Sequence, residues 1–223
     1  MSKNNQFPLP RAILFDWDNT LVDTWPLIHG ALVETFESMG QTPWTLDEVK
    51  SKVAKSLRDS FPALFHERWE EAAKIYQDAY LARHLKNLQA MPEAARLLEA
   101  LHKRVKFLGI VSNKKGPSLR LELKHLGWDR YFDAAIGSQD AEHDKPHPAP
   151  VYLALKGTGI EPGPDVWFVG DSAVDIECAV ASGCLPVLYG HHPEAVAALE
   201  KHSHGRHAHD HIMLEEWLRA AFV

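Results

Sequence analysis

The stretch RAILFDWDNTL, residues 11–21, decides the fold of this chain. Its first part, Ala12 to Phe15, is an unbroken apolar run, which is typical of a strand buried on both faces of a parallel sheet. Two aspartates, Asp16 and Asp18, follow directly. Ligands of open α/β sheets bind at the carboxyl ends of the strands, and two carboxylates there are costly unless a cation or a reaction needs them. A single Asp could instead end the strand or cap the next helix, so the pair alone leaves a structural role open.

Four further apolar runs indicate strands, and helical patterns separate them. This alternation predicts an α/β fold: a Rossmann-like parallel sheet with helices on both faces. One of the helices is expected to open at Lys145-Pro146-His147-Pro148 and to run to about Lys156. The four predicted strands cover residues 105–111, 134–137, 166–169 and 185–189.

The region between the first two strands contains helical patterns and nothing that looks like a buried strand. It therefore predicts an all-helical insert. The expected division is a core domain formed by residues 1–24 and 90–223, and an inserted helical domain formed by residues 25–89.

Composition limits the possible classes of protein. Of 223 residues, 45% are hydrophobic and 24% charged, as in an ordinary globular protein, and the formal net charge of −6 argues against a nucleic-acid partner. The first residues, Met1 to Pro10, have no apolar core of signal-peptide length, and no run is long enough for a membrane helix. Two cysteines, Cys178 and Cys184, form no CxxC pair and are expected to be buried thiols. These features predict a cytoplasmic protein with no membrane partner, and they leave its oligomeric state open.

Four groups of polar residues fall after a predicted strand or at a predicted helix start. The groups are Asp16-Trp17-Asp18-Asn19-Thr20, then Ser112 followed by Asn113, then Lys145, and finally Gly170-Asp171-Ser172-Ala173-Val174-Asp175. In this order they resemble the four motifs of the haloacid dehalogenase superfamily of aspartate-nucleophile phosphohydrolases. Each group alone is a weak signal, but the ordered set is specific and covers nearly the whole chain.

The resemblance implies a phosphatase that works through an aspartyl-phosphate. Asp16 would be the nucleophile, and Asp18 the general acid and then the general base. The implied cofactor is Mg²⁺, held by Asp16, the main-chain carbonyl of Asp18, and Asp171. Asp175 would complete this set by steadying the metal's waters or Lys145.

The resemblance also implies a phosphate site made by Ser112, Asn113 and Lys145, together with the loop residues Trp17, Asn19 and Thr20. Asn19 stands where the family most often has Gly, but Asn tolerates left-handed backbone angles. Trp17 replaces the commoner Phe, and Thr20 is expected to support the turn.

The residue types themselves support only part of this interpretation. Ser-Asn after a strand is more often a turn, and Asp171 could simply cap a helix. Lys145 has a poorer structural explanation, because a cation at a helix start opposes the helix dipole.

The insert resembles the helical cap of the phosphoglycolate-phosphatase-like branch, which closes over the crevice and selects the substrate. Candidate contacts are Trp25, His29, Lys55 and Arg58, although each is more often surface or packing. The expected substrate is a small phosphorylated metabolite, with phosphoglycolate leading.

Two other functions remain as alternatives. A sugar phosphomutase would pass the phosphoryl group to a sugar hydroxyl, but the cap histidine and lysine that such enzymes carry are not identifiable here. A non-catalytic phosphate-binding module would have no need of Asp16, Asp18, Lys145 and Asp171 together.

A histidine-rich stretch, residues 202–211, and His191-His192 upstream of it are unusual. Imidazoles at this density could bind a transition metal. The composition fits a solvated loop better, and a loop is therefore the prediction.

Overall fold

The computed structural model describes residues 10–53 and 55–221. The segment in which no signal peptide was expected, residues 1–10, lies outside the described residues except for Pro10. Its centre is a six-stranded sheet in the order β5-β4-β1-β6-β7-β8, and every pairing in it is parallel. This order is that of a doubly wound α/β fold, so the predicted fold class is confirmed. The strands are β1 (Ala12–Phe15), β4 (Phe107–Lys115), β5 (Ala134–Ser138), β6 (Val166–Gly170), β7 (Leu185–Tyr189) and β8 (Arg206–Ala208).

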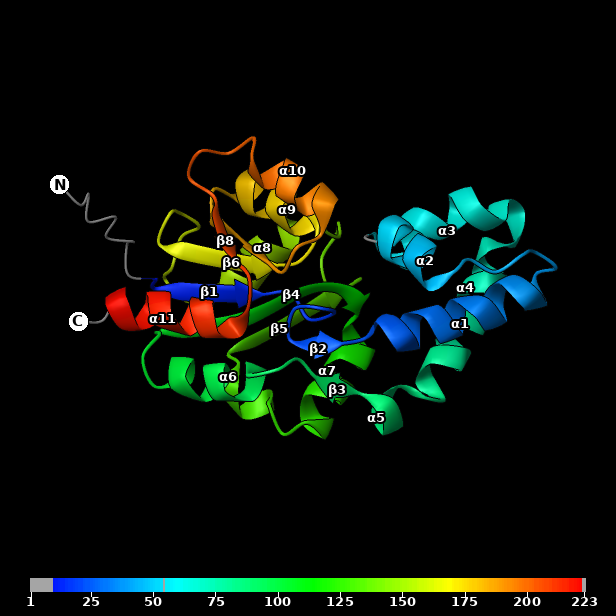
Figure 1. Cartoon of the computed structure of the whole chain (residues 1–223), viewed down its shortest axis with the longest axis horizontal. Helices are drawn as coiled ribbons and strands as arrows, with labels where there is room; N and C mark the ends of the chain where they lie inside the picture. Colours follow the sequence, from blue (N-terminus) through cyan, green and yellow to red (C-terminus); the bar gives the residue numbers. More distant parts are fainter. Residues whose placement is uncertain (1–9, 54, 222–223) are drawn as a thin grey trace.

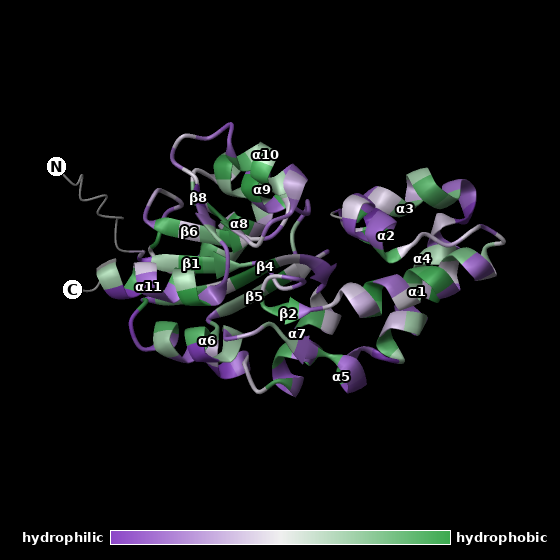
Figure 2. Ribbon diagram, viewed as in Figure 1, coloured by the Kyte–Doolittle hydropathy of each residue, from purple (hydrophilic) through white to green (hydrophobic). Residues whose placement is uncertain are grey.

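Helices cover both faces of this sheet (Figure 1). Alternate side chains of β1 enter different clusters: Ile13 and Phe15 pack with α6, α7 and α11, whereas Leu14 packs with α8 and α9. Figure 2 shows the resulting apolar strands between the helical layers. Both cysteines are buried, as predicted. The helices are α6 (Ala94–His102), α7 (Gly116–His125), α8 (Ala149–Leu155), α9 (Ala173–Ser182), α10 (Pro193–Leu199) and α11 (His211–Ala221), with a 3₁₀ turn at η2 (Asp129–Tyr131).

The insert is helical and has a hydrophobic cluster of its own. It lies beyond the carboxyl ends of the core strands (Figure 1). A short antiparallel ribbon, β2 (Val22–Asp23) with β3 (Gln89–Ala90), joins its two connections. This ribbon was not predicted, because strands of two residues have no detectable periodicity in the sequence. The helical elements are α1 (Trp25–Ser38), α2 (Leu46–Lys52), α3 (Leu57–Phe65), η1 (His66–Arg68), α4 (Trp69–Leu81) and α5 (His84–Asn87).

Two predicted boundaries and one predicted loop were wrong. Strand β4 continues past Val111 through a register shift, so Ser112 belongs to an irregular strand end and not to a following turn. Helix α8 begins at Ala149, four residues after Lys145, so the helix-dipole argument for Lys145 does not apply. The histidine-rich stretch is not simply a loop, because it contains β8, which pairs with β7. None of the described helices is long and apolar enough to cross a bilayer.

Candidate active site

The sheet brings the first and fourth motifs together. Strand β1 lies between β4 and β6, where the chain changes the direction in which it builds the sheet, and ligands bind at such a switch point. Phe15 pairs with Val169, and the amide of Asp16 donates to the carbonyl of Val169 at 2.8 Å. Asp16 and Asp171 therefore both emerge at this point.

Three carboxylates gather there around one ammonium. Ligand oxygens of Asp16, Asp171 and Asp175 all lie within 4.8 Å of one another. The buried Lys145 Nζ lies 2.8 Å from Asp16 Oδ1 and 2.7 Å from Asp175 Oδ1. One lysine cannot neutralise three carboxylates, and hard oxygen donors suit a divalent cation such as Mg²⁺. The donor set therefore fits the cation that the sequence predicted.

The three carboxylates of this cluster repel one another, and Lys145 offsets only part of their charge. Burial raises the pKa of Asp16 to about 7, helped by Asp175 and Asp18 and opposed by Lys145. Burial raises the pKa of Asp171 as well, helped by the carboxylates of Asp175 and Asp16 and opposed by Lys145. The pKa of Lys145 is raised, because its two carboxylate partners outweigh its burial. A group of acids held in this state is characteristic of functional sites.

Asp175 is occupied by protein partners. Its Oδ1 accepts from Lys145, and its Oδ2 accepts from the Ser172 amide at 3.0 Å and the Ser172 hydroxyl at 2.6 Å. Asp175 lies so close to Gly170 that a Cβ there would come within 2.3 Å of the Asp175 Cγ, so only glycine fits. Of the roles predicted for Asp175, these contacts favour steadying Lys145. Ser172, not Asp171, caps α9, which leaves Asp171 facing the pocket.

The turn after β1 has the geometry that its sequence predicted. Asn19 adopts a φ of 60°, in the left-handed region, and its side chain accepts from the Thr24 amide at 3.2 Å. Thr20 does not line the pocket; its hydroxyl donates to Asp171 Oδ1 at 3.3 Å. Thr20 is thus placed to hold Asp171, whereas Asn19 is part of the pocket wall.

Ser112 and Asn113 both line the pocket. The Ser112 hydroxyl accepts from the Lys114 amide at 3.2 Å, and its own proton can be donated to another group. The Asn113 side chain makes two bonds to the backbone of Lys145: Nδ2 donates to the carbonyl at 3.1 Å, and Oδ1 accepts from the amide at 3.0 Å. Its side chain therefore positions Lys145.

Trp17 is not in the pocket. Its side chain is fully buried, packs edge-on against Trp128 at 5.9 Å, and donates from Nε1 to Glu122 Oε2 at 2.7 Å. The alternation of an extended chain turns Trp17 to the opposite side from Asp16 and Asp18. The structure therefore does not support a substrate contact by the Trp17 side chain.

Lys114 is a site residue to which the sequence analysis gave no role. The side chain of Lys114 is only 7% exposed, and its Nζ lies 2.7 Å from Asp18 Oδ1 and 2.9 Å from Glu122 Oε2. It also donates to the Tyr80 hydroxyl at 2.6 Å. Neighbouring carboxylates raise the pKa of Lys114 although burial lowers it. Lys114 thus holds the carboxylate of Asp18. This carboxylate is not part of the cluster formed by Asp16, Asp171 and Asp175.

A pocket of about 130 Å³ connects the cluster to the insert. Arg58 crosses this boundary, because its Nε donates to Asp144 of the core at 2.6 Å. Three of the four predicted insert contacts line the pocket; His29 does not, and its Nε2 lies 3.1 Å from the Trp44 carbonyl. The wall consists of Asp16, Asp18, Asn19, Ser112, Asn113, Lys114, Lys115, Ser118, Ser138, Gln139, Lys145, Asp171 and Ser172 from the core, and Trp25, Ile28, Val53, Lys55, Ser56, Leu57, Arg58, Tyr76, Gln77 and Tyr80 from the insert.

Comparisons with known proteins all find hydrolases. Residues 13–188 match the family described as haloacid dehalogenase-like hydrolase. The chain is 32% identical over 165 residues to the pyrophosphatase PpaX of Anoxybacillus flavithermus, covering 74% of this chain and 76% of that protein. It is 30% identical to the phosphoglycolate phosphatase of Photorhabdus laumondii, with 81% of each covered. A haloacid dehalogenase-like hydrolase from Streptococcus pneumoniae superposes with a TM-score of 0.81 at 25% identity, covering 92% of this chain and 97% of that one.

Proposed function

Because the chain belongs to the haloacid dehalogenase-like hydrolase family and is a phosphatase, we propose that it hydrolyses a small phosphorylated metabolite through an aspartyl-phosphate on Asp16. The observation that carries this proposal is the meeting of Asp16, Asp171 and Lys145 at the switch point of the sheet, beside Asp18. A nucleophile, an acid and a phosphate-binding cation are then within one pocket.

In this mechanism Asp16 Oδ attacks phosphorus, and the bond from phosphorus to the leaving oxygen breaks. Asp18 gives a proton to that oxygen, then takes one from the water that attacks the aspartyl-phosphate, which releases inorganic phosphate and restores Asp16. Ser112 and Lys145 bind the phosphoryl oxygens. Lys114 positions Asp18, and Asn113 positions Lys145.

The proposed cofactor is Mg²⁺, with Asp16, the Asp18 carbonyl and Asp171 as its ligands and Asp175 holding Lys145 beside them. When bound, the ion supplies positive charge against the carboxylates and the phosphate.

We propose that the insert, residues 25–89, is the cap that selects the substrate. Arg58 supports this role: it lines the pocket, and its Nη2 is buried with no hydrogen-bond partner among the described residues. Lys55 lines the same wall. Cations on the cap side suit a substrate with a second anionic group at its far end, as in phosphoglycolate or pyrophosphate. The small pocket suits a small substrate.

The test is release of inorganic phosphate from phosphoglycolate, pyrophosphate, sugar phosphates and nucleotides, with Mg²⁺ and after its removal by a chelator. We expect turnover that disappears without Mg²⁺ and returns when the ion is restored. Preference for phosphoglycolate or for pyrophosphate decides between the functions named for the two relatives. A folded protein that turns over none of these compounds with Mg²⁺ present would contradict the proposal.

Arg58→Gln tests the cap contact. We expect kcat/KM for the preferred two-anion substrate to fall about 10-fold, the effect of one lost charged hydrogen bond. Hydrolysis of p-nitrophenyl phosphate, which has no second anionic group, should change much less. Lys124→Gln, an exposed charge on α7, is the control. An equal loss on both substrates would argue against substrate contact by Arg58.

A further inference from the structure

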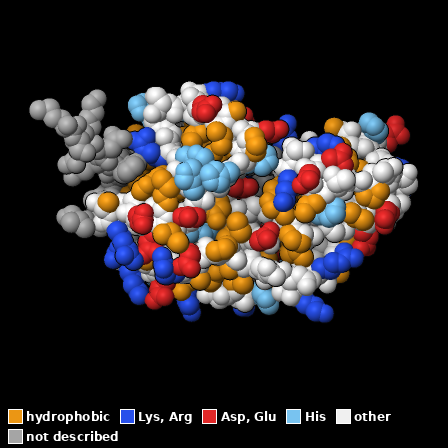
Figure 3. Space-filling model, in the orientation of Figure 1, with side chains coloured by type: hydrophobic (Ala, Val, Ile, Leu, Met, Phe, Trp, Pro, Cys, Tyr) orange, Lys and Arg blue, Asp and Glu red, His pale blue; other side chains and the backbone are white. Residues whose placement is uncertain are grey.

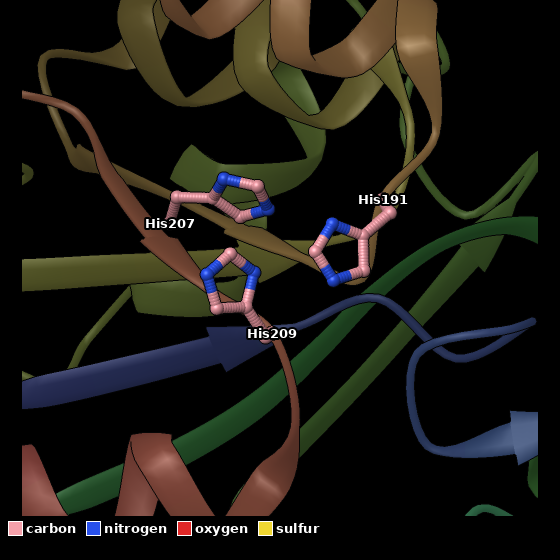
Figure 4. Close-up of side chains that lie close together, drawn as sticks. All are labelled: His191, His207 and His209. Atoms are coloured by element: carbon pink, nitrogen blue, oxygen red, sulfur yellow. The ribbon is translucent and has the colours of Figure 1, made fainter.

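Three histidines on the core lie together, well separated in the sequence from the proposed catalytic residues. Ligand nitrogens of His191, His207 and His209 all lie within 4.8 Å of one another. None of the three lines the pocket. Figure 3 shows histidine side chains gathered on this face beneath α10, and Figure 4 shows these three rings around one common space.

The sheet backbone holds the three positions in place. Strand β8 pairs in parallel with β7, with His207 opposite Leu188, and the Gly190 amide extends the pairing by donating to the Ala208 carbonyl at 3.0 Å. His207 lies within β8, and His209 follows the last residue of this strand directly. His191 follows Gly190 directly, so it faces them from the end of the neighbouring strand.

The ring of His207 is held by a hydrogen bond to the backbone. His207 Nε2 lies 2.5 Å from the Gly190 carbonyl. A carbonyl only accepts, so Nε2 carries the proton. Figure 4 shows the nitrogen at the tip of this ring on the side that faces His191, so an ion bound at Nε2 would displace its proton and its hydrogen bond to Gly190.

The other two rings can move to bind an ion. His191 and His209 are exposed and stacked, with ring centroids 4.5 Å apart and planes at 11°. Bound at about 2.0–2.1 Å, tetrahedral ligand nitrogens would lie roughly 3.3 Å apart. Exposed side chains reach such positions by rotamer changes.

We propose that His191, His207 and His209 bind one transition-metal ion, such as Zn²⁺ or Ni²⁺, with water in the remaining position. Imidazole donors favour these ions over Mg²⁺, which prefers oxygen, so the site is chemically distinct from the carboxylate cluster. The ion ties the edge strand β8 to the segment between β7 and α10, and it therefore stabilises this edge of the sheet.

The test is titration of the tag-free, chelator-treated full chain with Zn²⁺ and Ni²⁺ by calorimetry, with thermal unfolding in parallel. We expect one metal ion to bind per chain at this site, and we expect His191→Ala and His209→Ala each to weaken its affinity by at least about 10-fold. The melting temperature should rise with Zn²⁺ in the wild type and much less in these variants. Both side chains are exposed, so the metal-free variants should unfold like the metal-free wild type.

Two controls locate the ion. His204→Ala removes an exposed histidine outside the cluster, and Asp171→Asn alters the carboxylate cluster. Both variants should still bind one metal ion at the histidine site with the wild-type affinity. Absence of binding at micromolar metal, binding unaffected by His209→Ala, or equal weakening by His204→Ala would overturn the proposal.

Discussion

Replacing Asp16 by Asn is expected to lower kcat/KM by about 10⁴-fold or more, because an amide cannot act as the nucleophile that forms the acyl phosphate. The substitution keeps the size of the side chain. It also removes a carboxylate that repels Asp175, and Lys145 keeps Asp175 as its ion-pair partner, so the substitution adds no charge repulsion. The measurement is phosphate release at saturating Mg²⁺ on the preferred substrate.

Asp129→Asn is the matched control, since it makes the same chemical change at an exposed position in η2. It should retain activity within about twofold, as surface substitutions usually do. Circular dichroism and thermal unfolding verify that both variants are folded. If folded Asp16→Asn kept more than about one hundredth of the wild-type rate, Asp16 would not be the nucleophile.

Replacing Glu122 by Gln is expected to lower the free energy of unfolding by about 3 kcal/mol at neutral pH, because it removes a buried anion from its partners. Glu122 is fully buried. It accepts from Trp17 at 2.7 Å, Tyr80 at 2.9 Å, His84 at 2.7 Å and Lys114 at 2.9 Å. These partners come from both the core and the insert, so the loss should also loosen the contact between them.

This stabilisation has a defined pH dependence. Burial alone would raise the pKa of Glu122, but the charge of Lys114 and hydrogen bonds from His84, Lys114 and Trp17 outweigh it and lower the pKa to about 2. A glutamate in an unfolded chain titrates at about 4.3. Since the folded pKa is the lower one, the contribution is complete above the unfolded pKa and is lost as pH falls through the window from about 4 to about 2.

Urea unfolding at pH 7 and at stepwise lower pH measures both effects. The difference between wild type and Glu122→Gln should be largest at neutral pH and should shrink as the wild-type carboxylate becomes protonated. Glu177→Gln, at an exposed position of α9, is the control and should change stability by no more than about 0.5 kcal/mol. Equal stability of Glu122→Gln and the wild type at pH 7 would contradict this account.

The motifs were predictable because each one is local. The apolar run of β1, and the polar residues after β1 and β6, follow from patterns a few residues long, and the structure brings Asp16, Asp171 and Lys145 together as expected. Asn19 was expected to tolerate a left-handed conformation, and it adopts one.

Other features depended on partners far away in the chain. Trp17 sits inside the first motif, yet its side chain points to Glu122, which is 105 residues further on. Nothing around Glu122 in the sequence marks it as the residue that joins Lys114 to helices α4 and α5. The helix start predicted at Lys145 was wrong because the Asn113 side chain and two carboxylates, not the α8 dipole, hold this lysine.

The sequence by itself determined the α/β fold class and the ordered set of residues that carries the proposed chemistry, because periodicity and motif spacing are short-range properties of the chain. Only the tertiary structure decided which groups meet outside these motifs. Pairing of β8 with β7 turned a histidine-rich segment into part of the sheet and brought His191 to His207 and His209. Packing of the insert against the core placed Arg58 on Asp144 and joined Tyr80, Glu122 and Lys114. Such contacts arise from the register and burial of distant segments, and local sequence patterns do not encode them.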